Sequence, residues 1–536
     1  MNDESALLAA IIAHPDEDTP RLAYADWLDE HDQPERAEMI RVQCTYTAIS
    51  PTQREYPDLQ EGLWRTNARC WQWMKTSRPP LPPGFKYAST HVFDQYQRGF
   101  VHSVLGVTQP THGSPTAAEA EAICRGWAEL VATTTVRKLK LPTVLPTQLT
   151  QILAIPEAHH LADLLVSPQW GNECDDLARA IADAESVRRL KQLVIRGTVS
   201  STGTQALTRA TFERLEYFDL PQLDCTRDSV AQLIDARWFQ SLMQIRIPDS
   251  TAEALPALLV GLAHLPRLEH LSLEVAHSPS PKTFPTGRGF RELAQLFLWG
   301  EHASRAANWL ANEKMPKLIE FHIAGLKSRG FYALRSAAWF KQLWMLYLHN
   351  CFLNDRLVTA LTKSDLPELR IMRLGNNPFG RAGLLALADG SRLPNLTTLD
   401  LNCTYVQNAT SDDLVQFATA LNRPQLRNLW LDHWPLGPAG AKALAANPSL
   451  SNLTALSVNY CRIGNEGMNA LVRSPHLRNL YALGVAGNDL NKPTALARPE
   501  FLPRLKLIWL QNNRIASASV AQLQATRPWA VEDTDE

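Results

Sequence analysis

Residues 369–377 read LRIMRLGNN, and this nine-residue pattern decides the fold. It recurs as LYALGVAGN at residues 480–488 and as LKLIWLQNN at residues 505–513. Apolar residues occupy the first, fourth and sixth places of each copy, and asparagine occupies the ninth. The alternation at the centre of the pattern predicts a short β-strand whose fourth and sixth side chains face a core.

The apolar part of this pattern recurs at intervals of 25 to 30 residues, which helps to explain the 78 leucines of the 536-residue chain. A fixed period in this range predicts a solenoid, because one strand can bury its apolar edge only against the next copy. The fifteen copies begin at Val136, Leu161, Leu190, Leu215, Leu242, Leu268, Leu293, Leu318, Leu343, Leu369, Leu396, Leu426, Leu453, Leu480 and Leu505.

The segments that follow the strands return the chain to the next copy. Helical spacing of apolar residues predicts helices in four of these returns, at residues 354–363, 380–388, 437–446 and 465–473. The proline-rich return at residues 278–285 predicts an irregular segment instead.

These copies resemble leucine-rich repeats, and the glycine-spaced return at residues 437–444 resembles the ribonuclease-inhibitor type. The resemblance implies an α/β horseshoe-shaped solenoid with a parallel inner sheet and a mostly helical convex side. It also implies that the ninth-place asparagine bonds to backbone groups inside the turn, and that cysteine substitutes for it at Cys351 and Cys461.

The first fifty residues differ from the rest and predict a small all-α head. The run DTPRLAYADWLDE at residues 18–30, followed by PERAEMIR at residues 34–41, is similar to a short repeat-companion domain that begins large paralogue families in planctomycete-type bacteria. That resemblance implies a non-enzymatic accessory module. The head holds 11 acidic residues and 3 arginines, which fits either docking on a basic surface or solvated helix faces.

We therefore expect five segments along the chain. Residues 55–76 are rich in tryptophan and predict a helix that either binds a ligand or forms a buried capping layer. The expected segments are the helical head (1–50), a helix with a Pro-rich connector (51–84), an N-terminal cap of the solenoid (85–135), the repeats (136–515), and a C-terminal cap helix with an acidic tail (516–536).

Composition and motifs argue against several classes of function. The chain has no Walker loop, GxGxxG, GxSxG or HExxH motif, so we expect no enzymatic activity and no cofactor. Its eight cysteines are scattered without a CxxC pair, which predicts reduced thiols and no zinc site. A net charge of −1 and the lack of a long apolar run predict a cytoplasmic protein that binds neither nucleic acid nor membrane.

Large side chains occupy the outward-facing third, fifth and seventh places over six neighbouring copies. Tryptophan, tyrosine and arginine are typical of binding hot spots, so these positions predict a partner-binding surface on the concave sheet. The alternative is that neighbouring rings only stack on each other across the strands. Met345 and the turn residues Tyr405, His433 and Trp434 extend the predicted surface. Trp299, Tyr347, Arg373 and Trp430 are its predicted centre. The predicted partner-binding residues are Phe297, Trp299, His322, Tyr347, His349, Arg373, Asp400, Trp430 and Asp432.

The sequence thus predicts a monomeric, non-enzymatic scaffold that binds a protein or peptide on its concave face. Two other classes stay open. One is a structural array that assembles with copies of itself, and the other is an effector or an adaptor associated with an enzyme.

Overall fold

The computed structural model describes residues 3–48, 81–83, 85–87, 96–97, 100–101, 103–106, 117–168, 174–219, 222–224, 226–247, 254–275, 289–403, 408–527 and 531–532. These residues belong to two compact units, divided within the repeats between Leu296 and Phe297, except that Lys314–Lys317 belong to the first unit. The Trp-rich segment 55–76, the irregular return at 278–285 and Tyr405 lie outside the described residues, as does most of the Pro-rich connector.

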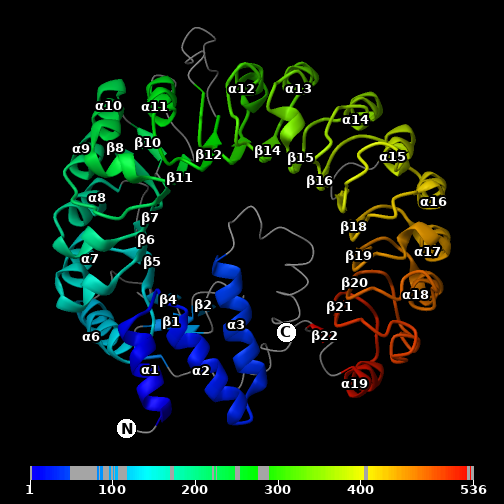
Figure 1. The fold of residues 1–536 in the computed structure, drawn as a ribbon, viewed down its shortest axis with the longest axis horizontal. Coiled ribbons are helices and arrows are strands. Elements are labelled where there is room, and N and C mark those ends of the chain that lie inside the picture. The colour runs from blue at the N-terminus through cyan, green and yellow to red at the C-terminus, as the bar shows by residue number, and fades with distance from the viewer. Residues whose placement is uncertain are drawn as a thin grey trace. The chain divides into compact units, whose positions relative to one another are not determined.

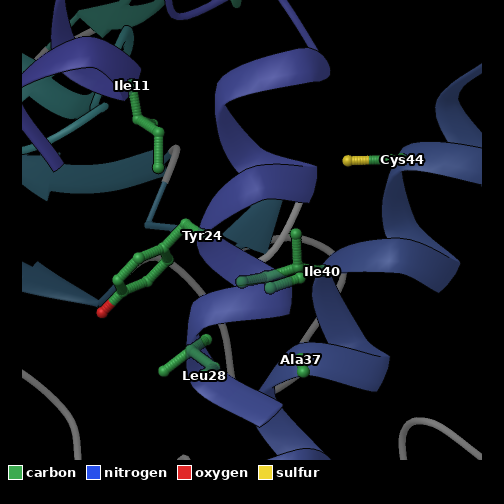
Figure 2. Packing of buried hydrophobic residues seen from close by; sticks show 7 residues of the cluster. Ile11, Tyr24, Leu28, Ala37, Ile40 and Cys44 are labelled. Carbon is green, nitrogen blue, oxygen red and sulfur yellow. The ribbon is translucent and has the colours of Figure 1, made fainter. Parts of the chain in front are cut away.

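The first unit begins with three helices, α1 (Asp3–Ala13), α2 (Thr19–Glu30) and α3 (Pro34–Ala48). They enclose a small apolar core to which each helix contributes, and Figure 2 shows the side chains at its centre. This core consists of Ile11, Tyr24, Ala25, Leu28, Ala37, Ile40 and Cys44.

The head packs against other parts of the first unit. Phe100 lies against the core of the head, with its ring 5.8 Å from that of Tyr24. Lys191 Nζ lies 2.9 Å from Asp16 Oδ2, and Arg137 donates a hydrogen bond to the carbonyl of Ile12. One acidic side chain of the head, Asp16, thus pairs with a lysine of the repeats, whereas Asp26 and Asp29 pair with Arg41 inside the head.

After the head, strands and helices alternate through the remainder of the first unit (Figure 1). Its strands are β1 (Phe85–Tyr87), β2 (Tyr96–Gln97), β3 (Phe100–Val101), β4 (Ser103–Gly106), β5 (Lys138–Val144), β6 (Asp163–Pro168), β7 (Gln192–Ile195), β8 (Thr198–Ser200), β9 (Tyr217–Asp219), β10 (Gln222–Asp224), β11 (Gln244–Ile247) and β12 (His270–Glu274). Its further helices are α6 (Ala117–Thr133), α7 (Pro146–Ala154), α8 (Asp175–Ala182), α9 (Ser201–Thr208), α10 (Arg227–Asp235) and α11 (Ala254–Leu262), with 3-10 turns η2 (Pro156–His160), η3 (Glu185–Arg189) and η4 (Arg237–Ser241).

The second unit continues the same alternation from β13 (Gln295–Trp299), whose residues 297–299 belong to it. Its further strands are β14 (Glu320–Ala324), β15 (Met345–His349), β16 (Ile371–Arg373), β17 (Thr398–Asp400), β18 (Asn428–Trp430), β19 (Ala455–Ser457), β20 (Ala482–Gly484), β21 (Leu507–Trp509) and β22 (Val531–Glu532). Its helices are α12 (Ala303–Leu310), α13 (Ser328–Arg335), α14 (Asp355–Thr362), α15 (Arg381–Ala388), α16 (Ser411–Ala420), α17 (Gly437–Ala446), α18 (Gly464–Val472) and α19 (Ser517–Thr526), with 3-10 turns η5 (Phe340–Gln342) and η6 (Pro448–Leu450).

Within the second unit, the strands lie side by side and the helices line the opposite side of the layer (Figure 1). Neighbouring strands from β14 to β22 pair in parallel. The fourth residues of successive copies stand opposite one another: Leu346, Met372, Leu399, Leu429, Leu456, Leu483 and Ile508. All seven are at most 2 % exposed, so the predicted inward positions form the core of this unit.

All fifteen predicted copies contribute a strand, and the four predicted return helices agree with α14, α15, α17 and α18 to within one residue at each end. In the described part of the tail, Val531 and Glu532 form β22 and pair with Ile508 and Trp509 of β21.

Ninth-place asparagines and cysteines form a series of hydrogen bonds inside the turns, as the resemblance implied; we call this series the ninth-place ladder. Asn377 Nδ2 donates to the carbonyl of Leu348 in the preceding copy, at 2.6 Å. Asn488 and Asn513 make the same bond to Val458 and Val485. The cysteines use their thiols, since Cys351 Sγ lies 3.1 Å from the carbonyl of Ile323 and Cys461 Sγ lies 3.0 Å from that of Leu431.

Candidate functional site

The candidate site lies on the open face of the second unit, by which we mean the sheet face opposite helices α12–α18 (Figure 1). The third, fifth and seventh residues of each copy form three rows across this face, because side chains alternate along a strand and the strands are in register. The three rows differ in burial and therefore in what each can offer to a partner.

The third-place row is buried, which corrects the expectation that Met345 lines a binding surface. Met345 is 1 % exposed and packs with Tyr347 and Ile371, with Trp344 beside them. Strands about 4.8 Å apart place like positions in contact, so neighbouring side chains cover one another. The buried residues of this row are Glu320, Met345, Ile371, Thr398, Asn428, Ala455 and Ala482, each between 1 % and 3 % exposed.

The fifth-place row forms a stacked ladder of rings. The ring centroids of Phe297 and His322 are 3.9 Å apart, and those of His322 and Tyr347 are 3.6 Å apart. The Arg373 guanidinium then lies 4.7 Å from the centre of the Tyr347 ring and 5.2 Å from that of Trp430. The rings therefore stack on each other across the strands, as the alternative prediction stated, and these contacts fix their relative positions.

Tyr347 differs from what its position suggests. It is only 7 % exposed, because His322 and Arg373 cover its two sides, whereas the sequence placed it as an outward ring without a structural role. Phe297, His322, Arg373 and Trp430 are each partly exposed and leave ring or guanidinium surface accessible.

Two carboxylates lie in the floor beside this ladder. Asp400 Oδ1 accepts a hydrogen bond from the Asn402 backbone N–H at 3.0 Å, and Asp400 Oδ2 lies 3.9 Å from Arg373 Nε. Burial raises the pKa of Asp400, an effect that the Asn402 N–H and the Arg373 charge oppose in part.

Asp432 has a different set of partners. Its Oδ1 accepts hydrogen bonds from Ser457 Oγ at 2.6 Å and from the Asn459 backbone N–H at 2.8 Å, and its Oδ2 accepts a longer one from Asn459 Nδ2 at 3.3 Å. Burial raises the pKa of Asp432 as well, against the lowering effect of these hydrogen bonds.

The seventh-place row alternates large and small residues. Trp299 and His349 project beside Ala324, Gly375 and Asn402, and His349 Nε2 is 3.1 Å from Asn376 Nδ2. A Cβ on Gly375 would lie 2.9 Å from both His349 Nδ1 and the Asn402 carbonyl oxygen, so glycine keeps this part of the face open. Ala324, Gly375 and Asn402 were not among the predicted site residues, although they are small or short side chains between larger ones in the same row.

These rows enclose a groove of about 460 Å³, which we call the main groove. Seven of the nine predicted site residues line it, together with Ala324, Gly375 and Asn402: Phe297, Trp299, His322, Tyr347, His349, Arg373 and Asp400. The other two, Trp430 and Asp432, line a neighbouring hollow of about 280 Å³, and Asn402 borders both. The structure thus brings all nine predicted residues to one continuous part of the open face.

Two of the predicted turn residues, His433 and Trp434, do not line the main groove. Trp434 is 1 % exposed, and its Nε1–H donates to the Leu401 carbonyl at 2.5 Å. Trp434 occupies the ninth place of the copy that begins at Leu426. Like the ninth-place asparagines, it donates a hydrogen bond to a carbonyl of the preceding copy. His433 instead stacks on Tyr460, with ring centroids 4.7 Å apart, and lines a separate hollow of about 330 Å³.

Other kinds of site find no support in the part of the chain that the structure describes. No three His, Cys, Asp or Glu side chains there gather as a metal site would require. Among the helices that the structure describes, none is long and apolar enough to cross a membrane.

Comparison with known proteins bears on the repeats. A family model described as "Leucine Rich repeat" matches residues 449–472, which cover the strand β19 and the helix α18. No curated protein sequence matches the chain.

Several solved structures show a distant likeness. A TLR13–ssRNA13 complex is 15 % identical with a TM-score of 0.41, and the match covers 79 % of this chain and 65 % of that one, which is less than two thirds of its length. The Rad7–Elc1 complex in yeast is 14 % identical with a TM-score of 0.40, covering 68 % and 85 % of the two chains. An internalin (InlF) from Listeria monocytogenes is 16 % identical with a TM-score of 0.32, covering 74 % and 95 %.

These likenesses are too distant to carry an argument. The matched repeat, the strand register and the ninth-place ladder are the observations that define the fold. The chain carries leucine-rich repeats, and its architecture is an α/β leucine-rich-repeat solenoid.

Proposed function

We propose that this chain is a non-enzymatic scaffold that binds a segment of a protein partner in the main groove. The observation that carries the proposal is the groove itself, about 460 Å³ in volume and lined by partly exposed aromatic rings, two histidines and one arginine. Solenoids of stacked repeats commonly bind partners on the extended surface formed by their strands.

The side chains of the main groove suit a polar peptide better than a phosphate backbone. Arg373 lies beside Asp400, so the charged side chains largely cancel and no basic stripe follows the groove. Aromatic rings and arginine dominate binding energy where they are held in place. The stacked ladder holds these groups before a ligand arrives, which lowers the entropy that binding costs.

The length of the site also fits an extended segment. From β13 to β17 the main groove crosses four strand spacings, or about 19 Å at ~4.8 Å each, which is the length of roughly six extended residues. The proposed partner is therefore a peptide segment, either isolated or displayed on a folded protein.

The proposal is tested by selecting peptides from a random display library with the wild-type protein and measuring the affinity of the best peptide by fluorescence anisotropy. Trp299→Ala and Arg373→Ala should each weaken binding by about thirtyfold, the usual effect of truncating a hot-spot residue. The matched control is Phe352→Ala, because Phe352 is a 56 % exposed ring that does not line the main groove. If the groove variants bind like wild type, or if the control loses affinity equally, the main groove is not the site.

A further inference from the structure

The smaller hollow beside the main groove, which we call the Trp430–Trp509 hollow, has a composition of its own. It has a volume of about 280 Å³ and lies over β18–β21, with Trp430 and Trp509 among its lining residues. The fifth-place residues between the two tryptophans are Ser457 and Gly484. A Cβ on Gly484 would lie 2.5 Å from Ser457 Oγ, so the chain keeps this place free of side-chain bulk.

Asp432 supplies the only charged side chain among the residues that line this hollow. In the described part of the chain, no lysine or arginine nitrogen lies within 4.0 Å of its carboxylate, whereas Asp400 has Arg373 at 3.9 Å. Its hydrogen bonds come from neutral groups of Ser457 and Asn459, and Oδ2 receives only the 3.3 Å contact. A partly buried carboxylate with no described lysine or arginine beside it is stabilised by an approaching positive charge, so this side chain favours a cationic ligand.

The neighbouring copy shows how this chain itself holds a cation. The Arg373 guanidinium lies between the rings of Tyr347 and Trp430 and beside the carboxylate of Asp400. The Trp430–Trp509 hollow also has aromatic rings and a carboxylate, but Ser457 stands in the place that corresponds to Arg373, and Gly484 in the place that corresponds to Asp400. Cations bind favourably over indole faces, and more so where a carboxylate balances the charge.

We propose that the Trp430–Trp509 hollow receives a lysine or arginine side chain of the partner. The inference rests on the proposed function, because it assigns a side-chain preference to the partner that the main groove binds. The cation enters between the two indoles and pairs with Asp432 Oδ2, the oxygen with the weaker hydrogen bond. The hollow therefore sets which residue the partner must carry next to the segment bound in the main groove.

The test uses protein labelled with 5-fluorotryptophan and ¹⁹F NMR, in which Trp430→Phe and Trp509→Phe assign the two relevant resonances. The probe is Nα-acetyl-lysine amide, and its neutral counterpart is Nα-acetyl-norleucine amide, which has a similar chain without the ammonium group. The lysine probe should shift both resonances saturably, with an affinity at least tenfold above that of the norleucine probe. Equal affinity for the two probes, or no shift of these two resonances with either probe, overturns the proposal.

Asp432→Asn should weaken binding of the lysine probe by about tenfold, because it removes the charge and keeps the shape. Asp365→Asn is the matched control, since Asp365 is an exposed carboxylate that does not line the hollow. Unchanged affinity in Asp432→Asn, with the other fluorine resonances in their wild-type places, also overturns the proposal.

The two proposals can fail independently. If the protein binds the lysine probe but selects no peptide from the display library, the scaffold function is refuted and cation binding in the Trp430–Trp509 hollow is not. If it selects peptides through Trp299 and Arg373 but does not discriminate lysine from norleucine, only cation binding in the hollow is refuted.

Discussion

Replacement of Asn377 by alanine tests whether the ninth-place ladder supports the groove. Asn377 is 1 % exposed and lies in the turn that follows β16. Its Oδ1 accepts hydrogen bonds from the backbone N–H groups of Cys351 at 2.8 Å and Leu353 at 3.1 Å, while its Nδ2 donates to the Leu348 carbonyl at 2.6 Å. These bonds join the end of β15, which carries His349, to the turn after β16, which holds Gly375, and both residues line the main groove.

Asn377→Ala leaves three buried backbone groups of the preceding copy without their partner, the N–H groups of Cys351 and Leu353 and the carbonyl of Leu348. At about 1–3 kcal/mol for each unsatisfied group, and with water relieving part of the cost, we expect a local destabilisation of about 3–5 kcal/mol. An array of repeats does not unfold in one step, so a single melting temperature is a poor measure.

Hydrogen exchange with mass spectrometry measures the opening of the affected turn directly. Peptides that cover residues 345–353 should exchange about a hundredfold to a few thousandfold faster in Asn377→Ala, since every 1.4 kcal/mol is a factor of about ten. Asn395→Ala is the control, because Asn395 is exposed and makes one hydrogen bond, to the Pro367 carbonyl. Asn377→Cys should fall between the two, as cysteine supplies the donor at Cys351 and Cys461 but no equivalent acceptor. Exchange in Asn377→Ala that resembles the Asn395→Ala control would refute this account of the turn.

Two further predictions follow from buried titratable groups. Because burial raises the pKa of Asp400, folding favours its protonated form, and the stability that this provides is lost as pH rises through the folded-state pKa. Asp400→Asn should therefore gain stability relative to wild type as pH increases from acidic to neutral, and a pH-independent difference in local exchange would contradict this. Burial also raises the pKa of the Cys351 thiol to about 12 and that of Cys461 well above its usual range, so both should resist iodoacetamide in the native protein at neutral pH. Partly exposed Cys124 should react first among the described cysteines, and modification of Cys461 at the same rate, located by peptide mapping, would show that its turn opens.

Much of the architecture could be predicted because the side-chain pattern within one copy specifies the strand and the return helix of that copy. The apolar first, fourth and sixth places specify a strand and its inward face, and they located all fifteen strands. Helical spacing located α14, α15, α17 and α18 to within a residue at each end. The nine site residues were found by the same periodicity, since the fifth and seventh places of a strand must face away from its fourth and sixth.

Burial on the open face was harder to predict, because it depends on residues one copy away. Met345 and Trp299 both occupy outward places, yet Met345 is 1 % exposed and Trp299 is partly exposed. The neighbours that decide this stand about 25 residues away along the chain and about 4.8 Å away across the sheet. Both places face outward in the repeat pattern, and the burial of the third-place row became visible only once the copies were stacked.

The tertiary structure also decided the role of two arginines that the sequence would place at the surface. Arg423 is 3 % exposed, and its guanidinium donates to the carbonyls of Leu387, Asp389, Arg392 and Leu393. Arg527 is 1 % exposed and bonds in the same way to the carbonyls of Leu496, Arg498, Leu502 and Leu505. The sequence by itself determined the period, the strands and the faces of the strands, because these depend on side-chain patterns within one copy. Which polar groups are buried was decided only when copies stacked, because each carbonyl at the end of a return segment must find a donor, and that donor comes from the following copy.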